Sequence, residues 1–105
     1  MMRGYVRVCG LSDLLDNRPL HVDIRHTPVC VVRTDGEVLA LLDECSHAEV
    51  ALSDGDVEAG TVECWLHGSR FDLRTGKPTG LPATEPVPVF PVHVDGDEVY
   101  VAVKE

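Results

Sequence analysis

The sequence predicts an all-β domain built from several short strands. Runs of alternating apolar residues recur along the chain, and two Asp-Gly pairs, Asp35-Gly36 and Asp95-Gly96, each stand between two such runs. An Asp-Gly pair in that setting is the strongest short-range signal for a β-hairpin. Five of the seven prolines fall between Pro78 and Pro91, which excludes a helix or an interior strand there. These patterns indicate β-structure with long loops inserted.

The N-terminal quarter of the chain predicts two strands separated by a helical turn. Residues Tyr5–Cys9 alternate between apolar and other side chains and predict the first strand. Residues Ser12–Asp16 predict a single helical turn with the serine as N-cap, and Pro19 ends it. Residues His21–Arg25 predict a second strand, and we place Pro28 in the turn that follows.

A hairpin follows and leads to a pair of candidate metal ligands. Val29–Arg33 and Val38–Leu42 are apolar, β-branched runs on either side of Thr34–Glu37. The second run leads directly to Cys45, so this cysteine is expected on a loop at the end of a rigid β-scaffold, where functional sites commonly lie.

The second half of the chain alternates short strands with loops. We expect a helical turn at Ala48–Leu52, stopped by Ser53–Gly55. Strands are predicted at Thr61–Trp65 and Phe71–Leu73, the second beginning after a tight turn at Gly68. The remaining expected elements are a turn at Arg74–Lys77, a strand after it, a stiff extended loop over about residues 78–91, and a closing hairpin of Pro91–Val94 with Glu98–Val103.

Length and hydropathy predict one soluble domain over residues 1–105. A chain of 105 residues buries roughly two-thirds of its unfolded surface. No apolar run approaches the roughly 20 residues that span a bilayer. The N-terminus passes straight into a strand-like pattern and lacks the apolar region of a signal peptide. We therefore expect a cytoplasmic location and no contact with a membrane.

The charge and the cysteine count narrow the partners and the compartment. A formal net charge of −9 argues against a nucleic-acid partner. It suits either docking onto a basic protein or simple solubility, and the charge alone does not decide between them. The four cysteines are expected as reduced thiols, since a cytoplasmic chain rarely keeps disulfides. Cys9 and Cys30 stand in apolar runs and are assigned to the core.

Two short-spaced thiol–imidazole pairs form the candidate ligand set. Cys45 and His47 are separated by one residue, Cys64 and His67 by two, and sixteen residues lie between the pairs. A Cys2His2 set suits zinc, although structural zinc fingers usually pair like with like. Mixed pairs also suit a [2Fe-2S] cluster in which two histidines replace two cysteines on one iron. Unrelated core cysteines and surface histidines would need two coincidences of close spacing.

At these residues the chain resembles the Rieske iron–sulfur proteins. The segments Cys45-Ser46-His47 and Cys64-Trp65-Leu66-His67-Gly68 match the Rieske signature, and the similarity continues through Phe71–Gly76, the proline-rich segment and the final hairpin. The resemblance implies an antiparallel β-sandwich of stacked sheets with a small inserted cluster-binding subdomain. Its cluster-binding loops would occupy about residues 43–72, and the loop at about 78–91 would cover the cluster.

The resemblance also implies how the ligands are shared between the irons. Cys45 and Cys64 would bind the inner iron of one Rieske [2Fe-2S] cluster, and His47 and His67 the outer iron. Ser69, Trp65 and Phe71 would surround it. The hydroxyl of Ser69 would be a hydrogen-bond donor toward cluster sulfur. Trp65 either shields the inner iron or belongs to the core, and we expect the core.

Other polar residues are given lesser roles. Arg70 is expected either on the surface or against a partner. His21, His26 and His93 have no thiol neighbours and are expected to be structural or surface residues.

Departures from the respiratory members of the family point to a low-potential carrier. Those proteins have two further cysteines in a disulfide, where this chain has Val50 and Leu66, and a tyrosine where it has Phe71. The resemblance is therefore to Rieske-type ferredoxins. These pass electrons from a flavoprotein reductase to a terminal non-heme iron oxygenase of a ring-hydroxylating system and are not catalytic alone.

Two alternatives remain open at the level of the sequence. One is the small Rieske-like subunit of a nitrite reductase or of another multi-subunit oxidoreductase, although many such subunits lack the four ligands. The other is a zinc-binding structural module.

Overall fold

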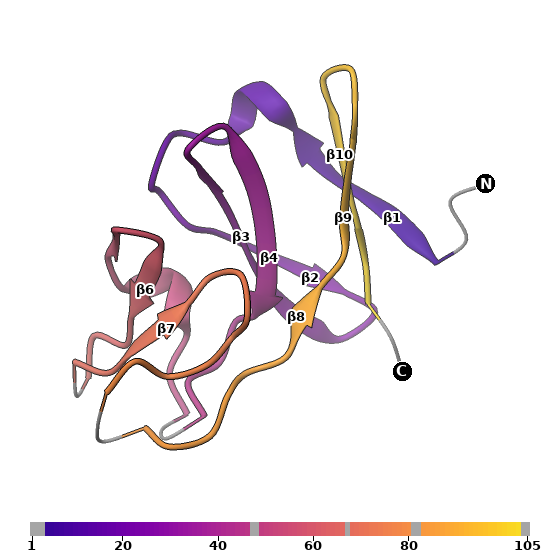
Figure 1. The fold of residues 1–105 in the computed structure, drawn as a ribbon. Helices are drawn as coiled ribbons and strands as arrows, with labels where there is room; N and C mark the ends of the chain where they lie inside the picture. Colours follow the sequence, from indigo (N-terminus) through magenta and orange to yellow (C-terminus); the bar gives the residue numbers. More distant parts are fainter. Residues whose placement is uncertain (1–3, 47–48, 67, 81–82, 104–105) are drawn as a thin grey trace.

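The computed structural model describes residues 4–46, 49–66, 68–80 and 83–103. Within them the chain forms three antiparallel sheets, in the strand orders β1-β10-β9, β2-β3-β4-β8 and β5-β6-β7, and two short 3-10 helices (Figure 1). The predicted all-β class is confirmed. The elements are β1 (Tyr5–Gly10), η1 (Leu11–Asp13), β2 (Leu20–Ile24), β3 (Thr27–Thr34), β4 (Glu37–Leu42), η2 (Leu52–Asp54), β5 (Val57–Glu58), β6 (Thr61–Glu63), β7 (Arg70–Asp72), β8 (Val89–Phe90), β9 (Val92–Asp95) and β10 (Glu98–Ala102).

Strand β3 lies between two hydrophobic cores, and each of its faces contributes side chains to one of them. Side chains alternate between the faces of a strand. Val29 and Val31 accordingly pack against β1 and β10, in a cluster with Val99 and Val101. Cys30 and its alternate neighbour Val32 pack in the other direction, toward the third sheet. Burial on both faces explains the continuous apolar run in the sequence.

The hairpin between β3 and β4 forms as its sequence predicts. Thr34 pairs with Glu37, and the two residues between them have φ of 52° (Asp35) and 78° (Gly36). Positive φ at both central positions is the geometry of a type I′ turn, which matches the twist of the flanking strands. The closing hairpin of β9 and β10 is also confirmed, with Glu98 opposite Asp95.

Four local predictions are wrong, and two of them concern the first third of the chain. Pro28 lies inside β3, opposite Asp23, and the turn instead uses Arg25 and His26, whose φ values are 50° and 71°. Proline is tolerated here because it stands near the first residue of the strand. The first helical turn is η1, with Gly10 rather than Ser12 as N-cap.

The second helical turn and the strand after residue 77 also differ from expectation. The second turn is η2, formed by the Ser53-Asp54 segment that was expected to stop it. Ala48 lies outside the described residues. No strand directly follows the turn among described residues 78–80, where Pro78 forms an isolated bridge with Phe71.

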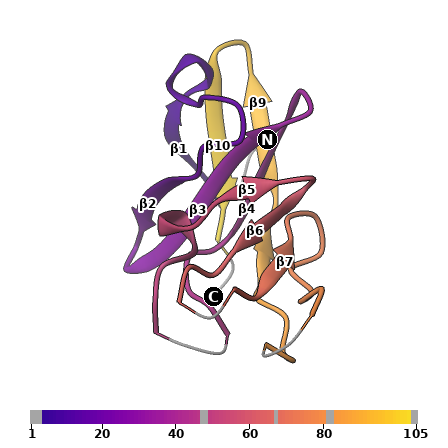
Figure 2. The same cartoon turned by 90° about the vertical axis from the view of Figure 1, so that its left-hand side faces the viewer.

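The third sheet is an insertion between β4 and β8. Figure 2 shows it in front of β3 and β4, with its connecting loops at the end of the molecule away from the β9–β10 turn. A buried cluster that includes Leu52, Val62 and Phe71 joins it to the face of the central sheet. Among the described residues, no helix is long and apolar enough to span a bilayer.

Candidate metal centre

Two of the four predicted ligands lie in one buried cluster. Cys45 follows β4 and is 4% exposed, and Cys64 follows β6 and is 0% exposed. Both belong to the core between the central and third sheets. None of the four cysteines, at positions 9, 30, 45 and 64, forms a disulfide, as predicted. His47 and His67 lie outside the described residues.

Each of these cysteines stands at the start of a loop whose two ends are joined by backbone hydrogen bonds. The histidine predicted to pair with that cysteine lies within the same loop in the sequence. The Cys45 N–H donates to Val50 O at 3.0 Å. The Cys64 N–H donates to Ser69 O at 2.6 Å, and the Gly68 N–H donates to Cys64 O at 2.8 Å. Gly68 has a φ of 78°, which glycine adopts at little cost, so the predicted tight turn is confirmed. Both loops therefore have fixed ends around the predicted ligands.

The proline-rich segment is hydrogen-bonded to both loops. Ser46 Oγ donates to Glu85 O at 2.6 Å, and Ser69 Oγ accepts from the Ala83 N–H at 3.1 Å. Farther along, the Val87 N–H donates to Gly76 O at 2.8 Å. The expectation of an extended loop is confirmed over residues 83–88. It is wrong at Val89–Phe90, which instead form β8 at the edge of the central sheet beside β4.

A buried carboxylate anchors the loop that carries Cys45. The Asp43 side chain is 0% exposed and accepts from Ser53 N–H at 2.6 Å and Ser53 Oγ at 2.5 Å. His21 Nδ1 lies 2.5 Å from the same carboxylate, and this hydrogen bond raises the pKa of His21. The sequence offered no sign of this role because the three residues are far apart in the chain. Asp43 thus ties β2, η2 and the Cys45 loop together.

The residues expected around the cluster divide into buried and exposed positions. Ser69 (1%) and Phe71 (0%) are buried, in line with a place beside the site. Trp65 is 53% exposed, so its assignment to the core is wrong. The turn from Cys64 to Ser69 directs residues 65 and 66 outward, and local apolarity does not reveal that direction.

Arg70 has a structural setting on the third sheet. Its Nε donates to Thr61 Oγ1 at 2.8 Å, and its guanidinium lies 3.9 Å from Glu58 and 3.7 Å from Glu63. Its side chain is only 28% exposed, which leaves little of it for a partner.

The other two cysteines are core residues, as predicted. Cys9 is 6% and Cys30 0% exposed. Burial raises the pKa of both thiols, and at Cys30 the shift is large. Both thiols therefore stay protonated, as expected of cysteines that pack as small apolar side chains.

The donor set fits an iron–sulfur cluster as far as the described residues reach. Thiolates are the ligands that iron–sulfur clusters use, and Cys45 and Cys64 would supply two from a buried core. Within the described parts of the chain, no group of three or more potential metal-binding side chains comes together. The other two predicted ligands, His47 and His67, lie outside these parts, so the four-ligand set stays a prediction.

Comparison with known proteins gives a consistent answer. Residues 4–91 match the family model described as the Rieske [2Fe-2S] domain. The ferredoxin component of biphenyl 2,3-dioxygenase from Rhodococcus jostii (strain RHA1) is 41% identical over 90% of this chain and 89% of its own. The solved ferredoxin of carbazole 1,9a-dioxygenase from Nocardioides aromaticivorans IC177 is 44% identical with a TM-score of 0.92, over 95% of this chain and 98% of its own.

A second solved structure is a complex of reduced oxygenase and oxidised ferredoxin in carbazole 1,9a-dioxygenase. The matching chain is 35% identical, with a TM-score of 0.90, over 95% of this chain and 94% of its own. A nitrite reductase small subunit shares the fold, with a TM-score of 0.83, but is only 24% identical over 94% of this chain and 98% of its own. The dioxygenase ferredoxins are thus the nearer group.

Proposed function

The chain belongs to the Rieske [2Fe-2S] domain family, and from that premise we propose that it carries electrons from a flavoprotein reductase to a terminal non-heme iron oxygenase. Its relatives are ferredoxin components of dioxygenase systems, so it is an electron-transfer component and not catalytic on its own. The single observation that supports this most directly is the burial of Cys45 and Cys64 together, on two closed loops.

Cys45, His47, Cys64 and His67 are the proposed ligands. Their cluster supplies a site that gains and loses one electron. The two thiols would bind the inner iron, which agrees with their burial, and the two histidines the outer iron. Ser69 and Phe71 close the core around the thiols and exclude water. We propose that residues 1–105 form one Rieske domain with its ligand loops at about 43–72 and its covering loop at about 78–91.

A terminal oxygenase is the better supported of the two partners. A 35% identical ferredoxin was solved in complex with its oxygenase. The net charge of −9 would draw this chain toward a basic docking face. The reductase follows from the need to renew the electron after each transfer. The lack of a disulfide among the four cysteines, with Val50 and Leu66 at the disulfide positions, supports a cytoplasmic ferredoxin rather than a respiratory protein.

The ligand proposal is tested by four alanine variants of similarly buried cysteines. Cys45→Ala and Cys64→Ala should each abolish the bound iron and the visible absorption, because each removes a thiolate ligand. Cys9→Ala and Cys30→Ala are the matched controls and should keep about two irons per chain. Iron retained in Cys45→Ala or Cys64→Ala would overturn the assignment. Stoichiometric zinc in the wild-type chain would support a structural metal site instead.

The carrier role is tested with a terminal oxygenase from a related system. A suitable probe is the terminal oxygenase of carbazole 1,9a-dioxygenase from Nocardioides aromaticivorans IC177, whose own ferredoxin is 44% identical to this chain. The reduced wild-type chain should reduce that oxygenase under anaerobic conditions. Co-purification with a siroheme subunit would favour the nitrite reductase alternative.

A further inference from the structure

Two large apolar side chains stand in solvent immediately after a fully buried cysteine. Trp65 is 53% exposed and Leu66 45%, whereas Cys64 before them is 0% exposed. The hydrogen bonds that close the Cys64–Ser69 turn fix the backbone that presents them. The two residues are adjacent in the chain, and large exposed apolar surface in soluble proteins often marks an interaction site. We call Trp65 and Leu66 the apolar tip.

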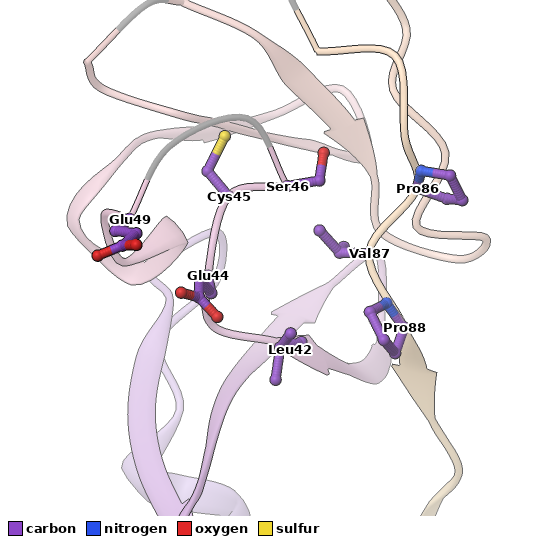
Figure 3. Close-up of a pocket in the computed structure, with 8 residues that line it drawn as sticks. All are labelled: Leu42, Glu44, Cys45, Ser46, Glu49, Pro86, Val87 and Pro88. Atoms are coloured by element: carbon purple, nitrogen blue, oxygen red, sulfur yellow. The ribbon is translucent and has the colours of Figure 1, made fainter.

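A recess lies beside the other ligand loop. Its volume is about 440 Å³. Figure 3 shows Glu44 and Glu49 on one side of it and Pro86, Val87 and Pro88 on the other. Leu42 forms part of its floor, and Cys45 and Ser46 complete the lining. The recess therefore combines apolar walls with two carboxylates.

The two carboxylates are available to an outside cation. Glu44 and Glu49 are both exposed, and neither forms an ion pair with any other part of the chain that the structure describes. The stem of an arginine or lysine packs on apolar surface while its charged head seeks a carboxylate. A basic side chain from a partner protein therefore suits this recess in both shape and charge.

The loops after β4 and β6, which carry Cys45 beside the recess and the apolar tip respectively, lie at one end of the molecule in Figures 1 and 2. The ligand loops lie at the end opposite the β9–β10 turn in either view. We propose that this end docks the terminal oxygenase, with the apolar tip entering an apolar hollow and the recess receiving an arginine or lysine. This proposal rests on the proposed function, and it adds which residues of this chain make the contact.

Charge favours the oxygenase over a second copy of this chain. Two copies would each carry a net charge of −9 and would bring four glutamates into the same interface. Like charges placed against each other disfavour such an association. A partner with basic residues around an apolar hollow avoids that repulsion, and apolar anchors of this kind dominate binding energy when they are fully covered.

The apolar tip is tested by Leu66→Ser, with Leu15→Ser as the matched control. Leu15 is 61% exposed and follows η1, outside the ligand loops. Binding to the carbazole oxygenase of Nocardioides aromaticivorans IC177 should weaken about tenfold or more in Leu66→Ser and stay within about twofold in Leu15→Ser. Iron content and reduction by dithionite are measured on the same samples to separate docking from loss of the cluster.

The recess is tested by Glu49→Lys against Asp95→Lys. Each substitution raises the net charge by the same two units, and Asp95 is exposed on β9 at the opposite end. Glu49→Lys should weaken binding several-fold more than Asp95→Lys, and the difference should shrink at high salt. This pair keeps the proposal testable if Leu66→Ser loses its iron.

The outcomes separate this proposal from the proposed function. Equal binding by Glu49→Lys and Asp95→Lys, or by Leu66→Ser and Leu15→Ser, would overturn the docking assignment while leaving the carrier role intact. A wild-type dimer that Leu66→Ser converts to a monomer would also overturn it, in favour of a second copy. Failure of the iron-loaded wild-type chain to reduce the oxygenase would instead count against the proposed function.

Discussion

The buried Ser69 side chain accepts a hydrogen bond from the backbone N–H of Ala83, with Oγ and N 3.1 Å apart. This contact joins the second ligand loop to the proline-rich segment. The first ligand loop makes a similar link through Ser46 and the carbonyl of Glu85. The covering segment is thus attached separately to each half of the proposed cluster site.

Ser69→Ala should reduce both stability and midpoint potential. Removing Oγ leaves the buried Ala83 N–H without its acceptor, which costs about 1–3 kcal/mol of unfolding free energy. The potential should fall if the hydroxyl also donates toward cluster sulfur. Denaturant unfolding and a redox titration check the two effects. Thr79→Ala is the control, because its exposed hydroxyl bonds only weakly to Arg70 O at 3.3 Å. An unchanged potential would mean that the Ser69 hydroxyl is directed elsewhere.

Gly76→Ala should be far more damaging than the same change at Gly36. The two glycines have nearly equal φ values of 79° and 78°. A Cβ at Gly76 would lie 2.0 Å from Val87 O, while a Cβ at Gly36 would meet nothing within 4 Å. We expect a loss of about 2–5 kcal/mol at Gly76, from strain plus overlap, against about 1–2 kcal/mol at Gly36. Thermal unfolding gives the comparison, and equal losses would show that the covering segment is not held there.

His21 should stabilise the fold in a pH-dependent way. Its hydrogen bond with Asp43 raises its pKa above 6.5, so the folded state binds the proton more tightly than the unfolded state. The contribution is complete below pH 6.5 and is lost as pH rises through the folded-state pKa. The unfolding free energy of the wild type should therefore exceed that of His21→Gln most at acid pH. The side chain is 43% exposed, which limits the effect. A gap that widens at alkaline pH would contradict the assignment.

The sequence predicted elements best where a local rule decides the structure. Asp35-Gly36 dictates its own turn, and the alternation around Cys30 places that thiol in the core. Local rules failed where distant contacts decide. Arg25 and His26 form a turn without any turn-forming residue type, and β5 is too short to show a pattern.

The same distinction between local rules and distant contacts applies at the candidate site. The spacing of the Cys and His residues was sufficient to propose the ligands. The Asp43 anchor depends on His21 and Ser53, and the exposure of Trp65 depends on how the turn is closed by Ser69. Such contacts between distant segments leave no mark in the local sequence.

The central claim is that Cys45, His47, Cys64 and His67 hold a low-potential Rieske cluster, and its most direct test is the midpoint potential of the purified protein. Phe71 is buried beside the site and has no hydroxyl to donate to a cluster sulfur. We predict a value near the low end of the Rieske range, about −150 mV, because few hydrogen bonds stabilise the reduced state. A value above about +100 mV would contradict the account.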